Sequence, residues 1–173
     1  MLAAAGMWFG MARSAKAGED TLKIGSPAPD FSRQTADGKT FSLKDLQGKR
    51  AVVLFFYPKD ETSVCTKEAC TFRDSYQKFQ ELGAEVVGVS GDDKESHEHF
   101  AANHHLQYQL ISDSDGSLRK LYRVQNSMGL IPGRVTFVID KEGTIRMIFN
   151  NMMDGPRHVK EALDTLQSIN SGR

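Results

Sequence analysis

The stretch AVVLFFYPKDETSVCTKEAC, residues 51–70, decides the fold of this chain. Residues 51–57 form a continuous apolar run that ends at Pro58, and such a run is typical of a central strand buried on both faces. A short polar segment follows, and then both cysteines of the chain, Cys65 and Cys70. We therefore expect a junction from strand to helix with two thiols near the start of the helix.

The segment from Cys65 to Leu82 has the length and the periodicity of a helix. Its apolar residues recur at spacings of three, four and three, which places them on one face: Ala69, Phe72, Tyr76 and Phe79. Gly83 stands where a C-cap glycine is common. These features predict a helix over residues 65–82, followed at once by a strand over residues 84–90.

The rest of the chain alternates β-rich runs with amphipathic stretches. We expect further strands over residues 108–111, 135–139 and 144–149, with a turn over residues 140–143. Helices are expected over residues 95–104 and 116–123, together with a last one from Pro156 that turns Val159, Leu163 and Leu166 inward. A short hairpin is expected around residues 36–39. This order predicts an α/β chain with a thioredoxin-like fold, in which helices flank a central mixed sheet.

Length and charge limit the classes of function. The chain has 173 residues, enough for one domain, which we place over residues 21–173. Its 22 basic residues balance 22 acidic ones, so charge gives no reason to expect a nucleic acid or an anionic membrane as partner.

Residues 1–20 differ in composition from the rest. The first twelve are apolar or small, Ala15-Lys16-Ala17 resembles a cleavage site, and no acidic residue precedes Glu19. Twelve residues are too few to span a bilayer, which needs about 20. Residues 1–20 are interpreted either as a targeting segment, for a plastid or for export, or as a disordered tail of a cytoplasmic protein.

The position of Cys65 suits a reactive thiol. At a helix start, unpaired backbone N–H groups and the helix dipole favour negative charge, and the thiolate is the nucleophilic form of cysteine. Thr62, three residues earlier, can offer its hydroxyl to the sulfur or to a bound substrate. The alternative is that Cys65 is an inert, buried small side chain.

The spacing of Cys65 and Cys70 makes a ready-made disulfide impossible in a continuous helix. Five residues rise about 7.5 Å, which places the two Cα atoms about 8 to 9 Å apart, beyond the roughly 7 Å that a disulfide can bridge. Such a pair suits a cycle with two shapes, one folded and one with the helix start unwound. Otherwise Cys70 simply packs against its neighbours.

Pro58, Thr62 and Cys65 stand at the P-x-x-x-T-x-x-C spacing of peroxiredoxins. The pair of Cys65 and Cys70 resembles the peroxiredoxin Q, or bacterioferritin comigratory protein, subgroup. The resemblance runs from about Leu22 to Leu166, and its clearest stretches are SPAPDF, FFYPKDET, CTFRDSY, GVSGDD and IPGRVTFVID.

The resemblance implies a role for each of these residues. Cys65 would be the peroxidatic cysteine, which attacks hydrogen peroxide or an organic hydroperoxide and becomes a sulfenic acid. Cys70 would resolve it as an intramolecular disulfide, recycled by thioredoxin or a similar dithiol. Thr62 would hydrogen-bond peroxide and thiolate, Pro58 would shield the pocket, and Arg134 would stabilise negative charge. No metal, haem or flavin is expected, and we expect a monomer.

One departure from the family pattern precedes the nucleophile. Peroxiredoxins of this kind commonly have Pro-Gly there, whereas this chain has Ser63-Val64. Neither residue relaxes the turn as glycine does, and valine is stiff. This bears on how readily the helix start unwinds.

Three other interpretations compete with this one. The first is a metal site in a histidine cluster, formed by His97, His99, His104 and His105. These histidines are not spaced three or four apart, as metal ligands on a helix would be. Glu98, which lies between His97 and His99, fits a solvated helix face. A disulfide reductase of the thioredoxin type needs cysteines two residues apart. A redox sensor or holdase on the same fold stays open. Arg73 is expected to form an ion pair.

Overall fold

The structure is a computed structural model that describes residues 22–172. The expected targeting segment or tail over residues 1–20 lies outside these residues. No helix within residues 22–172 is long and apolar enough to cross a membrane.

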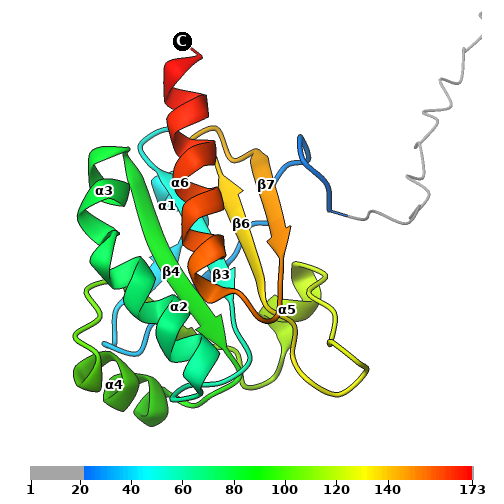
Figure 1. Cartoon of the computed structure of the whole chain (residues 1–173). Coiled ribbons are helices and arrows are strands. Elements are labelled where there is room, and N and C mark those ends of the chain that lie inside the picture. Colours follow the sequence, from blue (N-terminus) through cyan, green and yellow to red (C-terminus); the bar gives the residue numbers. More distant parts are fainter. Residues whose placement is uncertain (1–21, 173) are drawn as a thin grey trace, which may run out of the picture.

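A mixed five-stranded sheet forms the centre of the molecule (Figure 1), with the strand order β5-β4-β3-β6-β7. The three strands β3, β4 and β5 run parallel, β6 runs antiparallel to β3, and β7 runs antiparallel to β6. Their bounds are β3 (Ala51–Phe56), β4 (Ala84–Ser90), β5 (Gln109–Ser112), β6 (Val135–Ile139) and β7 (Ile145–Asn150). The predicted thioredoxin-like α/β class is confirmed.

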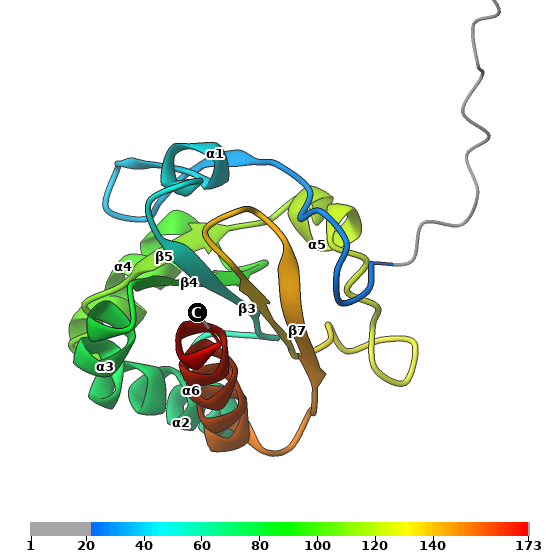
Figure 2. The same ribbon diagram turned by 90° about the horizontal axis from the view of Figure 1, so that it is seen from above.

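Helices cover both faces of the sheet (Figure 2). One face carries α2 (Ser63–Asp74), α3 (Tyr76–Glu81), α4 (Lys94–Asn103) and α6 (Gly155–Ser171). The other carries α1 (Leu43–Leu46), α5 (Ser117–Leu121) and the expected hairpin of β1 (Ser32–Gln34) and β2 (Thr40–Ser42). Both cysteines lie on the face of the sheet that α2 and α6 cover.

Strand β3 supplies side chains to a hydrophobic core on each side of the sheet. Because successive side chains of a strand point to opposite faces, Val53 and Phe55 pack beneath α2 and α6, whereas Leu54 and Phe56 pack beneath α5. Phe55 stacks on Phe72 of α2 with ring centroids 4.4 Å apart. The prediction of a central strand buried on both faces is confirmed.

The predicted helix over residues 65–82 is wrong in two respects. It begins at Ser63 rather than at Cys65, and it is interrupted at Ser75, where the backbone angles are φ −99° and ψ 0°. Serine is only a modest helix former, because its side chain competes for backbone hydrogen bonds. Phe72 and Phe79 still share one buried face across the break. The other expected helices and strands lie within two residues of their predicted bounds.

Candidate active site

Cys65 lies in the first turn of α2, just beyond the carboxyl end of β3. Thr62 is the N-cap, and the first helical hydrogen bond runs from Thr66 N to Thr62 O over 2.8 Å. The N–H groups of Ser63, Val64 and Cys65 therefore precede the regular helical bonds, and they place positive potential around the sulfur. Cys65 is only 2% exposed.

Arg134 points its guanidinium at Cys65. It immediately precedes β6, and because β6 is antiparallel to β3, the start of β6 lies next to the end of β3. Arg134 Nη2 donates a hydrogen bond to Cys65 Sγ over 3.0 Å, and the arginine is itself buried. Burial lowers the pKa of Arg134, but the negative groups Glu68 and Cys65 outweigh it and raise the pKa above its ordinary value.

The loops on both sides of the site are held by Arg119 of α5. Its Nη1 donates to Gly133 O over 2.8 Å and its Nη2 donates to Tyr57 O over 3.1 Å. Gly133 also lets the backbone of Gln125 come close, because a Cβ atom there would lie 2.3 Å from the carbonyl oxygen of Gln125. One half-buried arginine thus fixes the segment before Arg134 relative to the segment after β3.

Glu68 and His158 complete the buried titratable groups, although the sequence analysis pointed to neither. Glu68, three residues after Cys65 on α2, forms an ion pair with Arg134 through Oε2. Its other oxygen, Oε1, has no hydrogen-bond partner within residues 22–172 and lies 3.7 Å from His158 Nδ1 of α6. The spacing of three from Cys65 could have indicated Glu68, since residues three apart share a helix face. Nothing local indicates His158.

Thr62 and Pro58 lie in the loop that leads to Cys65. The Thr62 hydroxyl donates to Lys59 O over 2.9 Å, and this is its side-chain hydrogen bond within the described part of the chain. The possible contact between Thr62 and the Cys65 sulfur is therefore not formed in this arrangement. Pro58 is half-buried. The roles of both residues toward a peroxide stay predictions.

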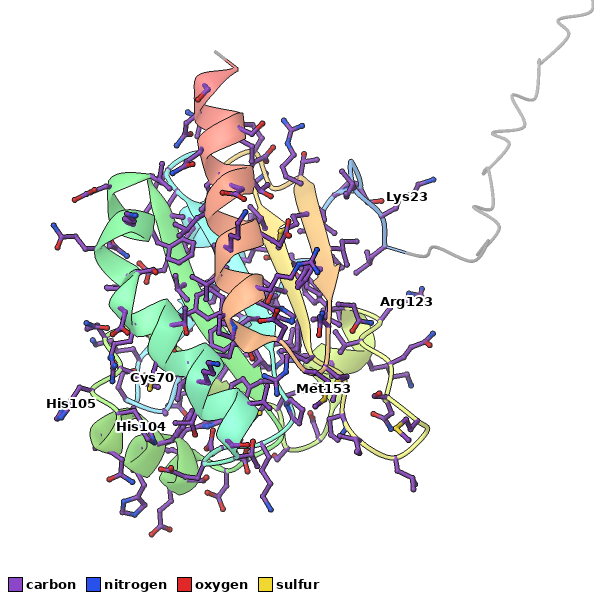
Figure 3. All side chains as sticks on the ribbon, in the orientation of Figure 1. Lys23, Cys70, His104, His105, Arg123 and Met153 are labelled. Atoms are coloured by element: carbon purple, nitrogen blue, oxygen red, sulfur yellow. The ribbon has the colours of Figure 1, made fainter. Side chains whose placement is uncertain are left out.

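Cys70 lies on the same helix as Cys65, and both thiols are free. Cys70 is half-buried on the side of the molecule where His104 is also found (Figure 3). Arg73 of α2 donates to His104 O over 2.8 Å and forms the expected ion pair with Asp74 at 3.0 Å. Because α2 is continuous from Ser63 to Asp74, a disulfide between the cysteines requires part of it to unwind.

The histidines of α4 divide into exposed and buried members. Glu98 and His99 are exposed, as expected for a solvated face. His97 instead is buried, and the interpretation of this segment as a solvated face is wrong for it. Its Nδ1 lies 2.8 Å from Asp60 Oδ2, and its Nε2 lies 3.1 Å from Ile111 O.

Asp60 anchors the loop before α2 through this buried cluster. Its Oδ1 accepts from the Tyr57 hydroxyl over 2.6 Å, and its backbone N–H donates to Asp92 over 2.8 Å. Burial alone would raise the pKa of Asp60, but the hydrogen bonds from His97 and Tyr57 outweigh it and lower the pKa. The carboxylate therefore holds the loop between β3 and α2 against the start of α4.

Known proteins match both the sequence and the fold. The model of the AhpC/TSA family matches residues 24–148. A chloroplastic peroxiredoxin Q from Populus jackii is 48% identical over 146 residues, which cover 84% of this chain and 68% of that protein. The crystal structure of peroxidoxin BcpB from Mycobacterium tuberculosis is 34% identical with a TM-score of 0.79, covering 86% of this chain and 98% of that one. A bacterioferritin comigratory protein from Xanthomonas campestris is 27% identical with a TM-score of 0.74, covering 86% and 97%.

A buried cysteine at a helix start, faced by an arginine on a thioredoxin-like sheet, defines the class of thiol-dependent peroxidases, oxidoreductases that act on peroxide. The chain belongs to the peroxiredoxin family, in the peroxiredoxin Q or bacterioferritin comigratory protein subgroup. The predicted family is confirmed.

Proposed function

We propose that Cys65 is the peroxidatic cysteine and that Arg134 activates it. The observation that carries this proposal is the 3.0 Å contact between Arg134 Nη2 and Cys65 Sγ, in a site where both side chains are buried. A guanidinium is always charged, so it stabilises a thiolate. The start of α2 adds further positive potential at the same atom.

The first chemical step is attack of the Cys65 thiolate on a peroxide oxygen. The S–O bond forms as the O–O bond breaks, which yields the sulfenic acid and an alkoxide or hydroxide that takes up a proton. Arg134 stabilises the charge that moves onto the departing oxygen. In this step Thr62 turns its hydroxyl from the Lys59 carbonyl toward the peroxide, and Pro58 limits access of water.

Cys70 completes the cycle as the resolving cysteine. Its thiol condenses with the sulfenic acid of Cys65, and water leaves as the disulfide forms. Both cysteines belong to α2, so the first turns of this helix unwind before the bond closes. Thioredoxin or a similar external dithiol then reduces the disulfide by exchange.

Hydrogen peroxide and organic hydroperoxides are the proposed substrates. Alkyl peroxide reduction is an activity of the bacterioferritin comigratory protein from Xanthomonas campestris, which supports the organic substrates here. The alternative function is a redox sensor or holdase on the same fold, in which the thiols report oxidation without rapid turnover.

Consumption of hydrogen peroxide with a thioredoxin system separates the two functions. Wild-type protein should turn over many equivalents, Cys65→Ser should turn over none, and Cys70→Ser should complete one turnover. Full peroxidase activity of Cys65→Ser would overturn the assignment. Wild-type protein that forms the disulfide but does not turn over would favour the sensor.

The compartment and the assembly belong to the same proposal. The plant relative is chloroplastic by name, which supports a plastid over the cytoplasm or export for this chain. A fluorescent protein fused after residue 20 should then enter plastids, and diffuse cytoplasmic fluorescence would contradict this.

We propose a monomer, since the two cysteines lie on one helix. Sedimentation of reduced and oxidised protein tests it.

A further inference from the structure

A chain of four side chains leads from α6 to the reactive sulfur. His158 Nδ1 lies 3.7 Å from Glu68 Oε1, Glu68 Oε2 pairs with Arg134 Nη1, and Arg134 Nη2 contacts Cys65 Sγ at 3.0 Å. Helices α2 and α6, which carry Glu68 and His158, lie side by side on the same face of the sheet in both Figure 1 and Figure 2. All four side chains are at most 2% exposed.

The charges of this buried chain do not balance if both acids ionise. Arg134 supplies one permanent positive charge, whereas the Cys65 thiol and the Glu68 carboxyl can each supply a negative one. A buried charge that lacks its own counterion is costly, so a single cation stabilises one anion better than two. Because Glu68 Oε1 has no hydrogen bond to any residue that the structure describes, the Glu68 carboxylate is the costlier anion to bury.

We propose that Cys65 and Glu68 compete for Arg134, so that Glu68 holds a proton when Cys65 is a thiolate, and that the electron-rich Nδ1 of His158, 3.7 Å from Glu68 Oε1, disfavours the Glu68 carboxylate. Glu68 and His158 are then positioning residues that set the pH at which Cys65 becomes nucleophilic. This inference rests on the role proposed for Cys65. The proton balance is Cys–SH plus Glu–COO⁻ in equilibrium with Cys–S⁻ plus Glu–COOH, without change in net charge.

The hydrogen bonds of His158 fix which ring nitrogen accepts. Its Nε2 lies 2.8 Å from the carbonyl oxygen of Asn151, which can only accept, so Nε2 carries the hydrogen. In the neutral ring Nδ1 is therefore an acceptor, reached by the Thr136 hydroxyl at 2.8 Å and facing Glu68 Oε1. Burial lowers the pKa of His158 to about 4, which keeps the ring neutral at pH 7.

Burial also acts on Glu68, in the opposite direction. It raises the pKa of this carboxyl well above its ordinary value, although Arg134 lowers it. Two further groups face the pair. Tyr108 donates its hydroxyl to Ala69 O, and burial raises its pKa well above the ordinary value, so it is neutral. Asp154, the N-cap of α6, is bound to the N–H of Arg157 and lies near His158.

Close packing holds α6 against α2 at this point. A Cβ atom on Gly155, the first residue of α6, would lie 2.7 Å from Glu68 Cβ and 3.0 Å from the carbonyl oxygen of Val64. Glycine therefore lets the start of α6 touch α2 where Glu68 and His158 meet.

When Cys65 is oxidised and its negative charge is gone, Arg134 is free for the Glu68 carboxylate. In overall proton count, Glu68 then releases the proton that the departing oxygen takes up.

The pH dependence of Cys65 alkylation tests the proposal without any peroxide. Trypsin cuts after Lys59, Lys67 and Arg73, so the two cysteines fall on separate peptides and mass spectrometry follows each one. Glu68→Gln removes the competing anion and should lower the alkylation midpoint of Cys65 by about 1 pH unit. His158→Leu removes the electron-rich Nδ1 atom that faces Glu68 Oε1, which favours the Glu68 carboxylate and should raise the midpoint.

The double variant and exposed controls separate this effect from a general loss of structure. Glu68→Gln with His158→Leu should match Glu68→Gln alone, because His158 acts through the carboxyl. The exposed residues Glu98 and His99 provide the control variants Glu98→Gln and His99→Leu, which should leave the midpoint unchanged. An unchanged or raised midpoint in Glu68→Gln, or additive shifts in the double variant, would overturn the proposal.

Infrared difference spectra of the wild-type protein give a second test that needs no folded variant. Reduced minus disulfide protein at pH 7 should show the C=O band of one protonated carboxyl, and its absence would overturn the proposal. Where Glu68→Gln folds, the band should vanish. If the alkylation shifts are as expected but Cys65 does not react with peroxide, only the proposed function is contradicted.

Discussion

Arg134 Nη2 lies 3.0 Å from Cys65 Sγ, although the two residues are 69 positions apart in the chain. The contact exists because β6 runs antiparallel to β3, so that the residue before β6 comes to the end of β3. Arg119 then holds both connecting segments. The sheet order therefore determines the distance between the proposed nucleophile and its cation.

Loss of the Arg134 side chain should slow the reaction of Cys65 with peroxide. In Arg134→Met the second-order rate constant should fall about 100-fold or more, because a preorganised donor to the reacting atoms is removed. Stopped-flow measurement of sulfenic acid formation gives this constant. Arg146→Met is the matched control, since Arg146 pairs with Asp140 at the far end of β6 and should leave the rate unchanged. Equal rates in the wild type and in Arg134→Met would remove Arg134 from the mechanism.

Closure of a disulfide between Cys65 and Cys70 should unwind part of α2. Hydrogen exchange should then be faster in the disulfide form than in the reduced form for amides of residues 65–74. Amides of β3 are the internal control, because the strand is buried on both faces and its exchange should not change. If α2 kept its protection in the disulfide form, local unwinding would be ruled out.

Replacement of Gly155 should destabilise the contact between α6 and α2. The added methyl group of Gly155→Ala meets Glu68 Cβ at 2.7 Å, and such overpacking costs about 1–3 kcal/mol. Urea unfolding measures the loss. Gly91→Ala is the matched variant, since the nearest atom to its new Cβ lies at 3.9 Å. Equal losses in the two variants would show that α6 does not pack as closely as described.

His158 should make the stability of the protein depend on pH. Its folded pKa of about 4 lies below the ordinary value of 6.5, so as pH falls through this window the unfolded chain binds a proton that the folded chain does not. Folding loses up to about 3 kcal/mol between pH 7 and pH 4 from this residue.

The variant His158→Gln lacks this loss. The difference in unfolding free energy between wild type and variant should therefore shrink toward pH 4, while titrating groups that do not face His158 contribute equally to both proteins. Urea titrations at a series of pH values measure it, with the exposed His99→Gln as control. A difference that stays constant with pH would show that His158 is not held neutral by burial.

Local patterns predict the strands and the thiols better than they predict the supporting charges. The run from Ala51 to Tyr57 indicates a buried strand because apolar side chains alone can fill both faces of a sheet. The contact between Glu68 and His158 joins two helices far apart in the chain, and no periodicity encodes it. The buried position of His97 likewise depends on Asp60, which belongs to a different loop. Such contacts follow from tertiary packing.

The interruption at Ser75 sets a boundary for the movement that the proposed cycle requires. Because α2 ends at Asp74, unwinding that starts near Cys65 has no continuous helix along which to spread into α3. Phe79 can stay packed in the core while Cys70 moves. A helix without this break would carry the proposed unwinding on toward Phe79, whereas the break at Ser75 confines it to α2.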